Sequence, residues 1–497
     1  MELFLTILFP FVGGVLLAFF PPNRGREIKL FSAFVAFSTL VLSIVIFALY
    51  DYREGGYQFT ESFTWLEHPL NISFSLGLDG ISAPMVLLTG IVMFAAILVS
   101  WNIEHRPKDF FVLLMMLVAG VYGTFVTRDL FFLFFFYELA VLPMYLLIGV
   151  WGSSSDFGTF IRTKEYGAMK LVLYLVAGSV LVWVSILAVY WAASQAGTPT
   201  FSLEELQSVE FNDGFKHFEN LFFPFFMVGF GVLAGLWPFH TWSPDGHVAA
   251  PTAVSMLHAG VLMKLGAYGI IRVGMILLPD GADTWMPVLI GLGTVNVLYG
   301  AIAAMSQQDL KYVVGYSSVS HMGYVFMGIA TLHPLGVGGA VLQMFSHGIM
   351  TALFFALVGV IYDRTHVRDI RVLEGLSKRM GFTAAFFAVA GLASLGLPGL
   401  SGFIAEFLVF VGVFEEYLPL AVLAVIGAAI TAVYILRLLA KVFFGPISPR
   451  WEHLGEASKI EMGAIALLGF VLLFVGVWPL PFMDVINAGV STIPGVS

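Results

Sequence analysis

The chain has 497 residues, of which 59% are hydrophobic and only 11% are charged, and its formal net charge at pH 7 is −9. A soluble domain carries about 25% charged residues, so this composition excludes an ordinary soluble protein and predicts one embedded in lipid. The sequence contains no cysteine, which excludes thiolate-ligated iron–sulfur clusters, covalent c-type haem and disulfides in this chain. Any redox centre that works with this chain must therefore lie in another polypeptide.

Apolar runs long enough to cross the hydrocarbon core recur along the whole sequence. A spanning helix needs about 20 such residues, and the first run has neither a basic stretch before it nor a small-residue cleavage site. We therefore expect a retained N-terminal helix and an all-α polytopic membrane protein of about fourteen transmembrane helices. The predicted spans lie near residues 2–20, 30–50, 80–101, 110–126, 130–150, 167–192, 221–238, 250–271, 286–305, 312–330, 335–361, 382–414, 418–436 and 461–480.

The basic residues test this number of spans, because Lys and Arg concentrate in loops on the inner side of a membrane. With the N-terminus outside, the inner loops hold 17 Lys and Arg residues and the outer loops hold four. The outer residues are Arg53, Arg128, Lys216 and Arg272, and two more, Lys170 and Lys264, fall inside spans. One helix more or fewer would scramble this asymmetry, so we expect both termini on the outer (periplasmic) side.

Two predicted spans contain Pro and Gly where a helix should continue. They are the seventh, at residues 233–238 (LAGLWP), and the twelfth, at 396–402 (GLPGLSG). Proline removes a helix hydrogen bond, and membranes tolerate this only where protein or a water-filled cavity satisfies the backbone. Matching breaks in two halves are typical of transporters with inverted repeats, although an ordinary proline kink is the alternative at either site. We expect two inverted five-helix repeats, residues 110–271 (helices 4–8) and residues 286–436 (helices 9–13). Helices 1–3, in residues 1–109, precede the first repeat, and helix 14, at 461–480, follows the second.

Six of the ionisable residues inside the predicted spans are candidates for function, because a charge at the bilayer centre costs at least about 2.5–3.5 kcal/mol. These candidate relay residues are Glu138, Lys170, Lys264, His321, His347 and Glu406. Acid, base and imidazole groups spread over several helices are typical of a proton relay. Two residues also fit a structural role: Lys170 lies near the inner end of its span and could snorkel, and His258 could be a hydrogen-bonded packing residue.

Four motifs, in order along the chain, resemble the antiporter-like subunits of respiratory complex I, which have relatives in Mrp-type cation/proton antiporters and membrane-bound hydrogenases. The motifs are FFLFFFYELAVLPMYLLIGVWG, PFHTWSPDGHVAAPTAVSMLHAGVLMKLGAYGIIR, DLKYVVGYSSVSHMGY and LPGLSGFIAEF. The similarity covers nearly the whole chain. The length, and a glutamate at Glu406 where L-type relatives usually carry lysine, resemble the M-type subunit, the counterpart of mitochondrial subunit 4.

The resemblance implies roles for the buried residues. It makes Glu138 the fifth-helix glutamate, Lys264 the eighth-helix lysine of the central relay, and Glu406 the terminal acid of the twelfth helix. His321 and His347 match the histidines of the tenth and eleventh helices. In such subunits, quinone reduction elsewhere in the complex drives proton uptake from the inside and release outside.

The resemblance also implies the surroundings of the chain. It predicts a non-redox translocase subunit of an NADH- or ferredoxin:quinone oxidoreductase, with no cofactor in this chain and with flavin, iron–sulfur clusters and quinone in partner subunits. The expected partners are L-type and N-type antiporter-like subunits, small membrane subunits and the lipid bilayer, and not nucleic acid. The expected location is a bacterial inner (plasma) membrane or a thylakoid.

Two positions depart from the family pattern. The family normally has a seventh-helix lysine that pairs with the fifth-helix glutamate, but that position is Leu233 here, in a stretch without a basic residue. Breaking a buried ion pair costs about 3–5 kcal/mol. We therefore expect Glu138 to be protonated at rest, or to be paired by a neighbouring subunit or by Lys170, which matches a lysine often found in the family's sixth helix. The second departure, His258, resembles the L-type pattern, and its six-residue separation from Lys264 predicts that the two face different directions.

Other functions fit part of the pattern. A cation/proton antiporter subunit of the Mrp type fits the same fold, although the acid of SGFIAEF and the length favour the quinone oxidoreductase. A structural membrane-arm subunit with weakened pumping fits the missing lysine at Leu233. A haem-bearing cytochrome with His321 and His347 as axial ligands leaves the buried acids and lysines without a role. The basic loop 364–379 fits either topology-setting charge or a docking site for another subunit.

Overall fold

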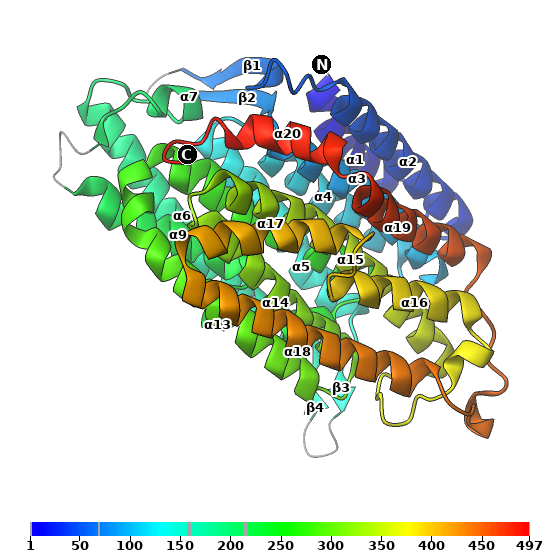
Figure 1. The fold of residues 1–497 in the computed structure, drawn as a ribbon. Helices are drawn as coiled ribbons and strands as arrows, with labels where there is room; N and C mark the ends of the chain where they lie inside the picture. Colours follow the sequence, from blue (N-terminus) through cyan, green and yellow to red (C-terminus); the bar gives the residue numbers. More distant parts are fainter. Residues whose placement is uncertain (1, 68–69, 157–160, 212–216, 497) are drawn as a thin grey trace.

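Long helices packed side by side make up nearly all of the structure, a computed structural model that describes residues 2–67, 70–156, 161–211 and 217–496 (Figure 1). Apolar runs form helices in lipid because a helix satisfies its own backbone groups. The first half contains α1 (Glu2–Ala18), α2 (Gly25–Leu49), α3 (Ser82–Val99), α4 (Pro107–Val126), α5 (Leu130–Trp151), α6 (Lys164–Gln195), α7 (Leu203–Leu206), α9 (Phe218–Ala234), α10 (Trp242–Ala249), α11 (Thr252–Leu257), α12 (Met263–Gly269) and the π-helical turns η3 (His258–Leu262) and η4 (Ile270–Met275). The second half contains α13 (Pro279–Ser306), α14 (Leu310–Ala330), α15 (Pro334–Thr365), α16 (Gly381–Ser394), α17 (Ser401–Glu416), α18 (Leu418–Phe443), α19 (Lys459–Val477) and α20 (Leu480–Val490).

Helices occupy every one of the predicted spans, but not every helix is a spanning helix by length and composition. Among the described residues, 11 helices are long and apolar enough to cross a membrane. The predicted spans that fall short contain α1, α14 and the pair α16–α17. The helices α1, α16 and α17 are too short, and α14 is less apolar because it contains several Ser and Tyr residues and a His. The chain is therefore a multi-pass membrane protein, and the number fourteen stays a prediction.

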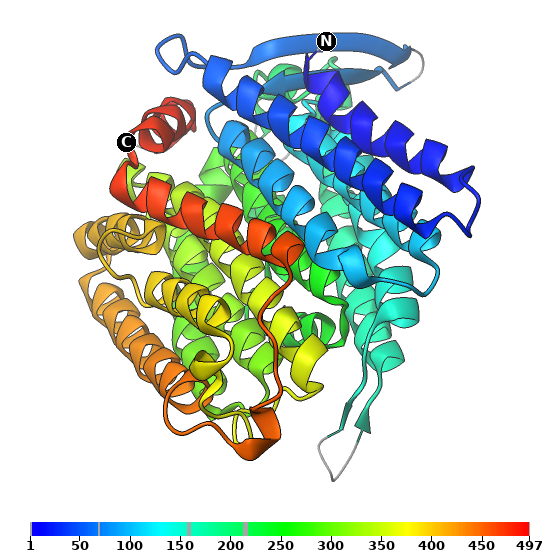
Figure 2. The same ribbon diagram turned by 90° about the vertical axis from the view of Figure 1, so that its right-hand side faces the viewer.

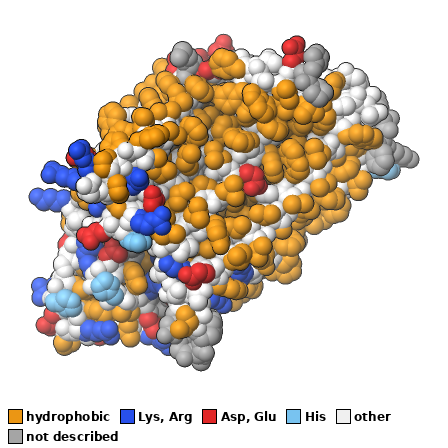
Figure 3. All heavy atoms as spheres, turned by 180° about the vertical axis from the view of Figure 1, so that it is seen from behind, with side chains coloured by type: hydrophobic (Ala, Val, Ile, Leu, Met, Phe, Trp, Pro, Cys, Tyr) orange, Lys and Arg blue, Asp and Glu red, His pale blue; other side chains and the backbone are white. Residues whose placement is uncertain are grey.

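The two ends of the helix bundle differ in structure. Two small antiparallel strand pairs, absent from the all-α prediction, lie at opposite ends: β1 (Gln58–Leu66) with β2 (Ile72–Leu78), and β3 (Ser155–Asp156) with β4 (Ile161–Arg162). Both termini lie at the end that carries β1 and β2 (Figures 1 and 2). Figure 3 shows a broad apolar band with Lys and Arg side chains gathered beyond one end of it. We call the end that carries β3 and β4 the basic end.

The innermost helices are those that carry most of the candidate residues. The most apolar stretch of α15 and that of the segment from α11 to η4 are completely buried inside the protein. α15 packs against α3, α11, α14, α17 and α19, so it forms the central pillar of the bundle. Polar side chains on these helices therefore face other protein groups and not lipid.

Both predicted helix breaks are confirmed. At the first, α9 ends at Ala234 and the chain passes through Gly235, with φ +81°, before α10 begins. Asn296 of α13 satisfies this irregular backbone, because its Oδ1 accepts from Trp237 N at 2.6 Å and its Nδ2 donates to Gly235 O at 2.8 Å. At the second, α16 ends at Ser394 and α17 begins at Ser401.

The central pillar leaves no room for a side chain where it crosses the π-helical turn η3. A Cβ at Gly348 on α15 would lie 2.5 Å from the carbonyl oxygen of Gly260 on η3. We expect Gly348→Ala to force the two backbones apart and to cost about 1–3 kcal/mol of stability. Thermal unfolding of the detergent-solubilised protein measures this loss.

Gly291→Ala on α13 is the matched control, because a Cβ there meets nothing within 4 Å. Alanine favours helix over glycine by up to about 1 kcal/mol, so this variant should unfold at the same temperature or slightly higher. Equal melting temperatures for the two variants would contradict the close approach.

Candidate functional site

The centre of the protein holds a lysine amine between neutral partners. Lys264 on α12 is completely buried. Its Nζ donates to the carbonyl oxygen of Ala259 and lies 2.9 Å from Nδ1 of His347 on α15. The other ring nitrogen of His347 lies 3.1 Å from Oγ of Ser318 on α14. A proton can therefore pass directly from the ammonium group to the imidazole ring.

A π-helical turn provides one of these partners. In η3 the backbone N–H of Met263 donates to the carbonyl of His258, five residues earlier, and not to that of Ala259, four residues earlier. The Ala259 carbonyl thereby loses its usual helical donor and is available to the amine of Lys264. The local change in helix geometry thus creates an acceptor at the position where a buried ammonium needs one.

A second cluster continues from His347 towards the broken twelfth helix. The ring of His321 on α14 lies 5.4 Å from the ring of His347, centroid to centroid. Its Nδ1 lies 2.9 Å from Oε1 of Glu406 on α17, and its Nε2 lies 2.9 Å from Oγ of Ser394. Gln343 donates to the same Glu406 oxygen at 3.2 Å. The helix break makes room for the acid, since a Cβ at Gly396 would lie only 3.2 Å from its Oε2.

Four of the six candidate residues thus form one buried row, Lys264–His347–His321–Glu406, which we call the central row. None of the four is more than 4% exposed, so none of them faces lipid. Both histidines already use both ring nitrogens, and their rings are too close for a porphyrin to lie between them. The haem alternative therefore has no support in this arrangement. Among the described residues, no three His, Asp or Glu side chains form a metal-binding group.

Two further buried histidines lie beside Lys264. The rings of His247 on α10 and His258 on η3 are 4.1 Å apart, and both lie within electrostatic reach of Lys264. The ring of His258 lies against Trp242 and His247 of α10, and it is part of the polar interior. Neither ring nitrogen of either histidine has a hydrogen-bond partner among the described residues. Because buried imidazole nitrogens require partners, water is expected to fill these positions.

Lys170 belongs to a separate cluster nearer the basic end. Its Nζ donates at 2.8 Å to Oδ2 of Asp245 on α10, and so it does not snorkel. Arg162 of β4 pairs with Oδ1 of the same carboxylate, which also accepts a 2.9 Å hydrogen bond from the hydroxyl of Tyr312. His240 is buried, neither of its ring nitrogens has a hydrogen-bond partner in the described part of the chain, and it lies within electrostatic reach of Lys170. Asp245 is therefore the anion that compensates both cations.

Glu138 on α5 is half-buried and stands apart from both clusters. Its Oε1 has no hydrogen-bond partner within the described protein, and Ser179 on α6 is its polar neighbour. Leu233, at the position of the missing lysine, is completely buried. Lys170 does not replace that lysine, because it is paired with Asp245. Of the three expected solutions, a protonated Glu138 and a cation from a neighbouring subunit remain.

One residue assigned to an outer loop lies elsewhere. Arg272 is buried in η4, inside a spanning helix, and pairs with Asp79 at the start of α3. Tyr57 and Tyr268 lie against its guanidinium group at 5.3 and 5.6 Å. The assignment of Arg272 to a loop is therefore wrong. Nothing nearby in the sequence indicated this, because its carboxylate partner lies nearly 200 residues earlier. The remaining basic residues still leave the outer loops poorer in positive charge.

Sequence reasoning missed several polar groups of the site. Asp245 and His247 lie within the quoted motif PFHTWSPDGHVAAP, where an acid and an imidazole in an apolar stretch gave a readable signal. Gln343, Ser318 and Ser394 gave none, because neutral polar residues are common on packed membrane helices.

The arrangement agrees with what is known of similar proteins. Residues 127–431 match the family model described as NADH:quinone oxidoreductase/Mrp antiporter, transmembrane region. The chain belongs to this family of multi-pass membrane proteins. Within the family it is similar to the proteins called chain 4 of NAD(P)H-quinone oxidoreductase. It is 37% identical to that of Acaryochloris marina over 95% of this chain and 88% of the relative, and 37% identical to one from Synechococcus elongatus over 95% and 87%.

Solved structures have the same fold. A chain of respiratory complex I from Thermus thermophilus with bound NADH superimposes with a TM-score of 0.87, at 27% identity, over 99% of both chains. A chain of the archaeal membrane-bound sulfane sulfur reductase gives a TM-score of 0.84 at 25% identity, over 96% of this chain and 76% of that one. A chain of the Mrp complex from Dietzia also gives 0.84, but at 18% identity it supports the fold alone. The resemblance to the M-type subunit of complex I is confirmed.

We expect Glu138 to carry a proton at rest, because within the described chain its Oε1 has no hydrogen-bond partner and no cation pairs with it in place of the missing lysine. Infrared spectroscopy should then show a carboxylic C=O band that Glu138→Gln removes. Leu233→Lys is the matched variant: a cation near the acid should convert it to a carboxylate and weaken the same band. If the band is absent from the unmodified protein, and partner subunits offer no cation, this expectation fails.

Proposed function

We propose that the chain relays protons across the membrane as a subunit of an NADH- or ferredoxin-driven quinone oxidoreductase. The observation that carries the proposal is the central row. It joins Lys264 on α12 to Glu406 on α17 through two imidazoles, and His347 contacts the lysine as His321 contacts the acid, each at 2.9 Å. Amine, imidazole and carboxylate can all exchange protons, and nothing in this row carries electrons.

The family and the cysteine-free composition support the same division of labour. Flavin, iron–sulfur clusters and quinone belong in partner subunits under this proposal, and the chain itself is a non-redox translocase subunit. L-type and N-type antiporter-like subunits and small membrane subunits are its proposed neighbours in the membrane. The unpaired Glu138, half-buried on α5, fits a contact with such a neighbour.

The orientation proposed for the chain follows from its charge. The basic end faces the inside, as Lys and Arg do in membrane proteins, and both termini face the outside. The proposed membrane is a bacterial plasma membrane or a thylakoid, in keeping with cyanobacterial relatives at about 37% identity. The proposed halves of the relay are the two inverted repeats, residues 110–271 and 286–436. Each contains one of the two broken helices.

A second candidate function is a structural subunit that has lost pumping. The buried Leu233 and the partnerless Glu138 oxygen favour it, because the first half of the relay then lacks a charge pair that the family uses. The intact central row argues against it. The experiment below separates the two functions.

Lys264→Met should abolish proton transfer through this chain. A positioned proton-transfer group typically contributes about 100-fold or more to rate, and methionine keeps the bulk of the side chain without the amine. The measurement is the number of protons pumped per electron in vesicles that hold the complete complex, with NADH or reduced ferredoxin as donor. The ratio should fall, while quinone reduction in the presence of an uncoupler should continue.

Lys441→Met is the control, since Lys441 is an exposed lysine at the end of α18. It should pump normally. An unchanged ratio in Lys264→Met and in Leu233→Lys would support the structural subunit. Sodium-dependent proton exchange without any electron donor would instead support an antiporter of the Mrp type.

A further inference from the structure

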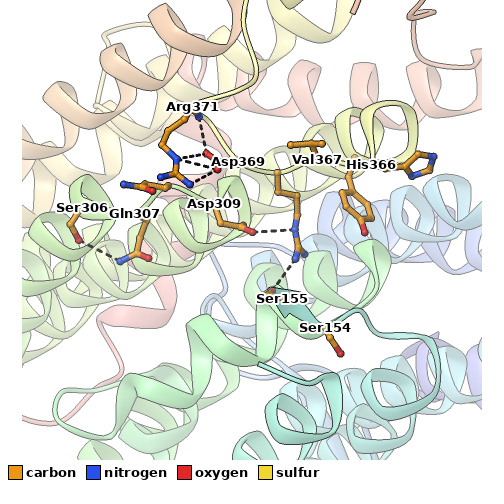
Figure 4. Close-up of a pocket in the computed structure, with 12 residues that line it drawn as sticks. Ser154, Ser155, Ser306, Gln307, Asp309, His366, Val367, Asp369 and Arg371 are labelled. Atoms are coloured by element: carbon orange, nitrogen blue, oxygen red, sulfur yellow. Dashed lines mark hydrogen bonds and ion pairs between the residues drawn. The ribbon is translucent and has the colours of Figure 1, made fainter. Parts of the chain in front are cut away.

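A polar cavity opens at the basic end, away from the residues described above (Figure 4). Its volume is about 680 Å³, which is enough for many water molecules. It lies between β3, the loop before α14, and the segment that follows α15. Its lining is polar, with Ser155, Gln307, Asp309 and Asp369 among the residues that face it.

The floor of this cavity is a buried arginine. Arg368 is 8% exposed and is held by three groups from different elements. Its Nε lies 3.2 Å from Oδ2 of Asp309, and it donates to Oγ of Ser155 at 2.9 Å and to the carbonyl of Val248, on α10, at 3.1 Å. Asp309 also accepts from Lys311 N at 2.8 Å, which fixes the start of α14 at the floor. Burial raises the pKa of Asp309 above its ordinary value.

Behind the floor lies a lysine that the relay described above does not use. Lys311 is 4% exposed, and its Nζ donates at 2.7 Å to the carbonyl of Ala250, just after the end of α10. Within the described chain no carboxylate lies within 4.0 Å of this amine. The charged groups around it are Asp309, Asp363 and Arg368, at electrostatic range.

One imidazole connects this lysine to the central row. His247, three residues before Ala250, lies within electrostatic reach of Lys311 and of Lys264. It is completely buried and has two ring nitrogens without partners. The same ring contacts His258, with 4.1 Å between centroids. Buried polar groups thus lie beneath the cavity and around Lys264, and His247 is within electrostatic reach of both lysines.

We propose that Lys311 carries protons between this cavity and Lys264, with His247 as the intermediate and Arg368 as the residue that closes the floor. The inference rests on the proposed function, of which it gives the inner access route. The ammonium of Lys311 releases one proton through water to the imidazole of His247. That ring releases its proton through water to the amine of Lys264, and Lys311 regains a proton from water in the cavity.

The simpler role for Lys311 is to cap the Ala250 carbonyl where α10 ends. The two roles differ in chemistry, because a cap needs only a donor, whereas a carrier must also lose its proton. Arginine donates hydrogen bonds but is not deprotonated in proteins. Lys311→Arg therefore preserves a cap and blocks a carrier.

The test measures protons pumped per electron by the complete complex in vesicles. We expect Lys311→Arg and Lys311→Met to lower the ratio as far as Lys264→Met does, while Lys441→Met leaves it unchanged. Normal pumping in Lys311→Arg, together with a loss in Lys264→Met, overturns this inference and leaves the proposed function standing. Normal pumping in Lys311→Arg and also in Lys264→Met overturns this inference and the proposed function together.

A chemical rescue guards against variants that fold poorly. Because the chain has no native cysteine, the new thiol is its single site of modification, and the complex without the variant, treated in parallel, reports any effect of reaction at cysteines of partner subunits. Lys311→Cys should lose pumping and regain it after aminoethyl methanethiosulfonate restores an amine at this position. Methyl methanethiosulfonate, which adds no amine, should not restore it. Mass measurement of the isolated chain reports the modification. Equal recovery with both reagents, or none with the amine once modification is complete, overturns the proposal.

Discussion

The structure depends on the contact between the amine of Lys264 and the imidazole of His347. A lysine at the centre of a bundle in lipid has no water to solvate it, and this one has no carboxylate at hydrogen-bond distance among the described residues. Its partners are an imidazole and a backbone carbonyl, which are neutral. An amine held in this way gains little from keeping its charge, so it can lose a proton and regain it at modest cost. A carboxylate in contact with the Lys264 amine would stabilise its ammonium form. The lysine would then keep its proton and the relay would stop.

The backbone is irregular where the polar side chains are. The π-helical turn beside Lys264 frees one carbonyl, and the break before Ser401 makes space for Glu406. Lipid would not tolerate such irregular backbone, but the surrounding helices satisfy it, as Asn296 does at the first break. The helices that cross at Gly260 and Gly348 pack closely enough to keep these groups in place. Close packing and polar function therefore rely on the same residues.

Charge is arranged differently in the two halves of the site. In the second half, His347 contacts Lys264, His321 contacts Glu406, and the two imidazole rings lie 5.4 Å apart, centroid to centroid. In the first half, the lysine expected near Glu138 is absent, and Asp245 compensates both Lys170 and Arg162. The histidines near that cluster and near Lys264 have ring nitrogens without a hydrogen-bond partner among the described residues. The loss of one lysine thus changes how the first half must work and leaves the second half intact.

The sequence by itself determined the membrane class, the positions of the helices, both helix breaks and the identity of four residues of the central row. These features are local, because apolar length, Pro and Gly, and an ionisable residue in an apolar run each leave a mark on neighbouring residues. Tertiary structure alone decided which charges meet. Asp245 pairs with Lys170 across 75 residues, and Asp79 pairs with Arg272 across 193. Such partners cannot be read from spacing, because packing of distant helices brings them together, and so Arg272 was assigned to a loop and the pairing of Lys170 with Asp245 was not predicted.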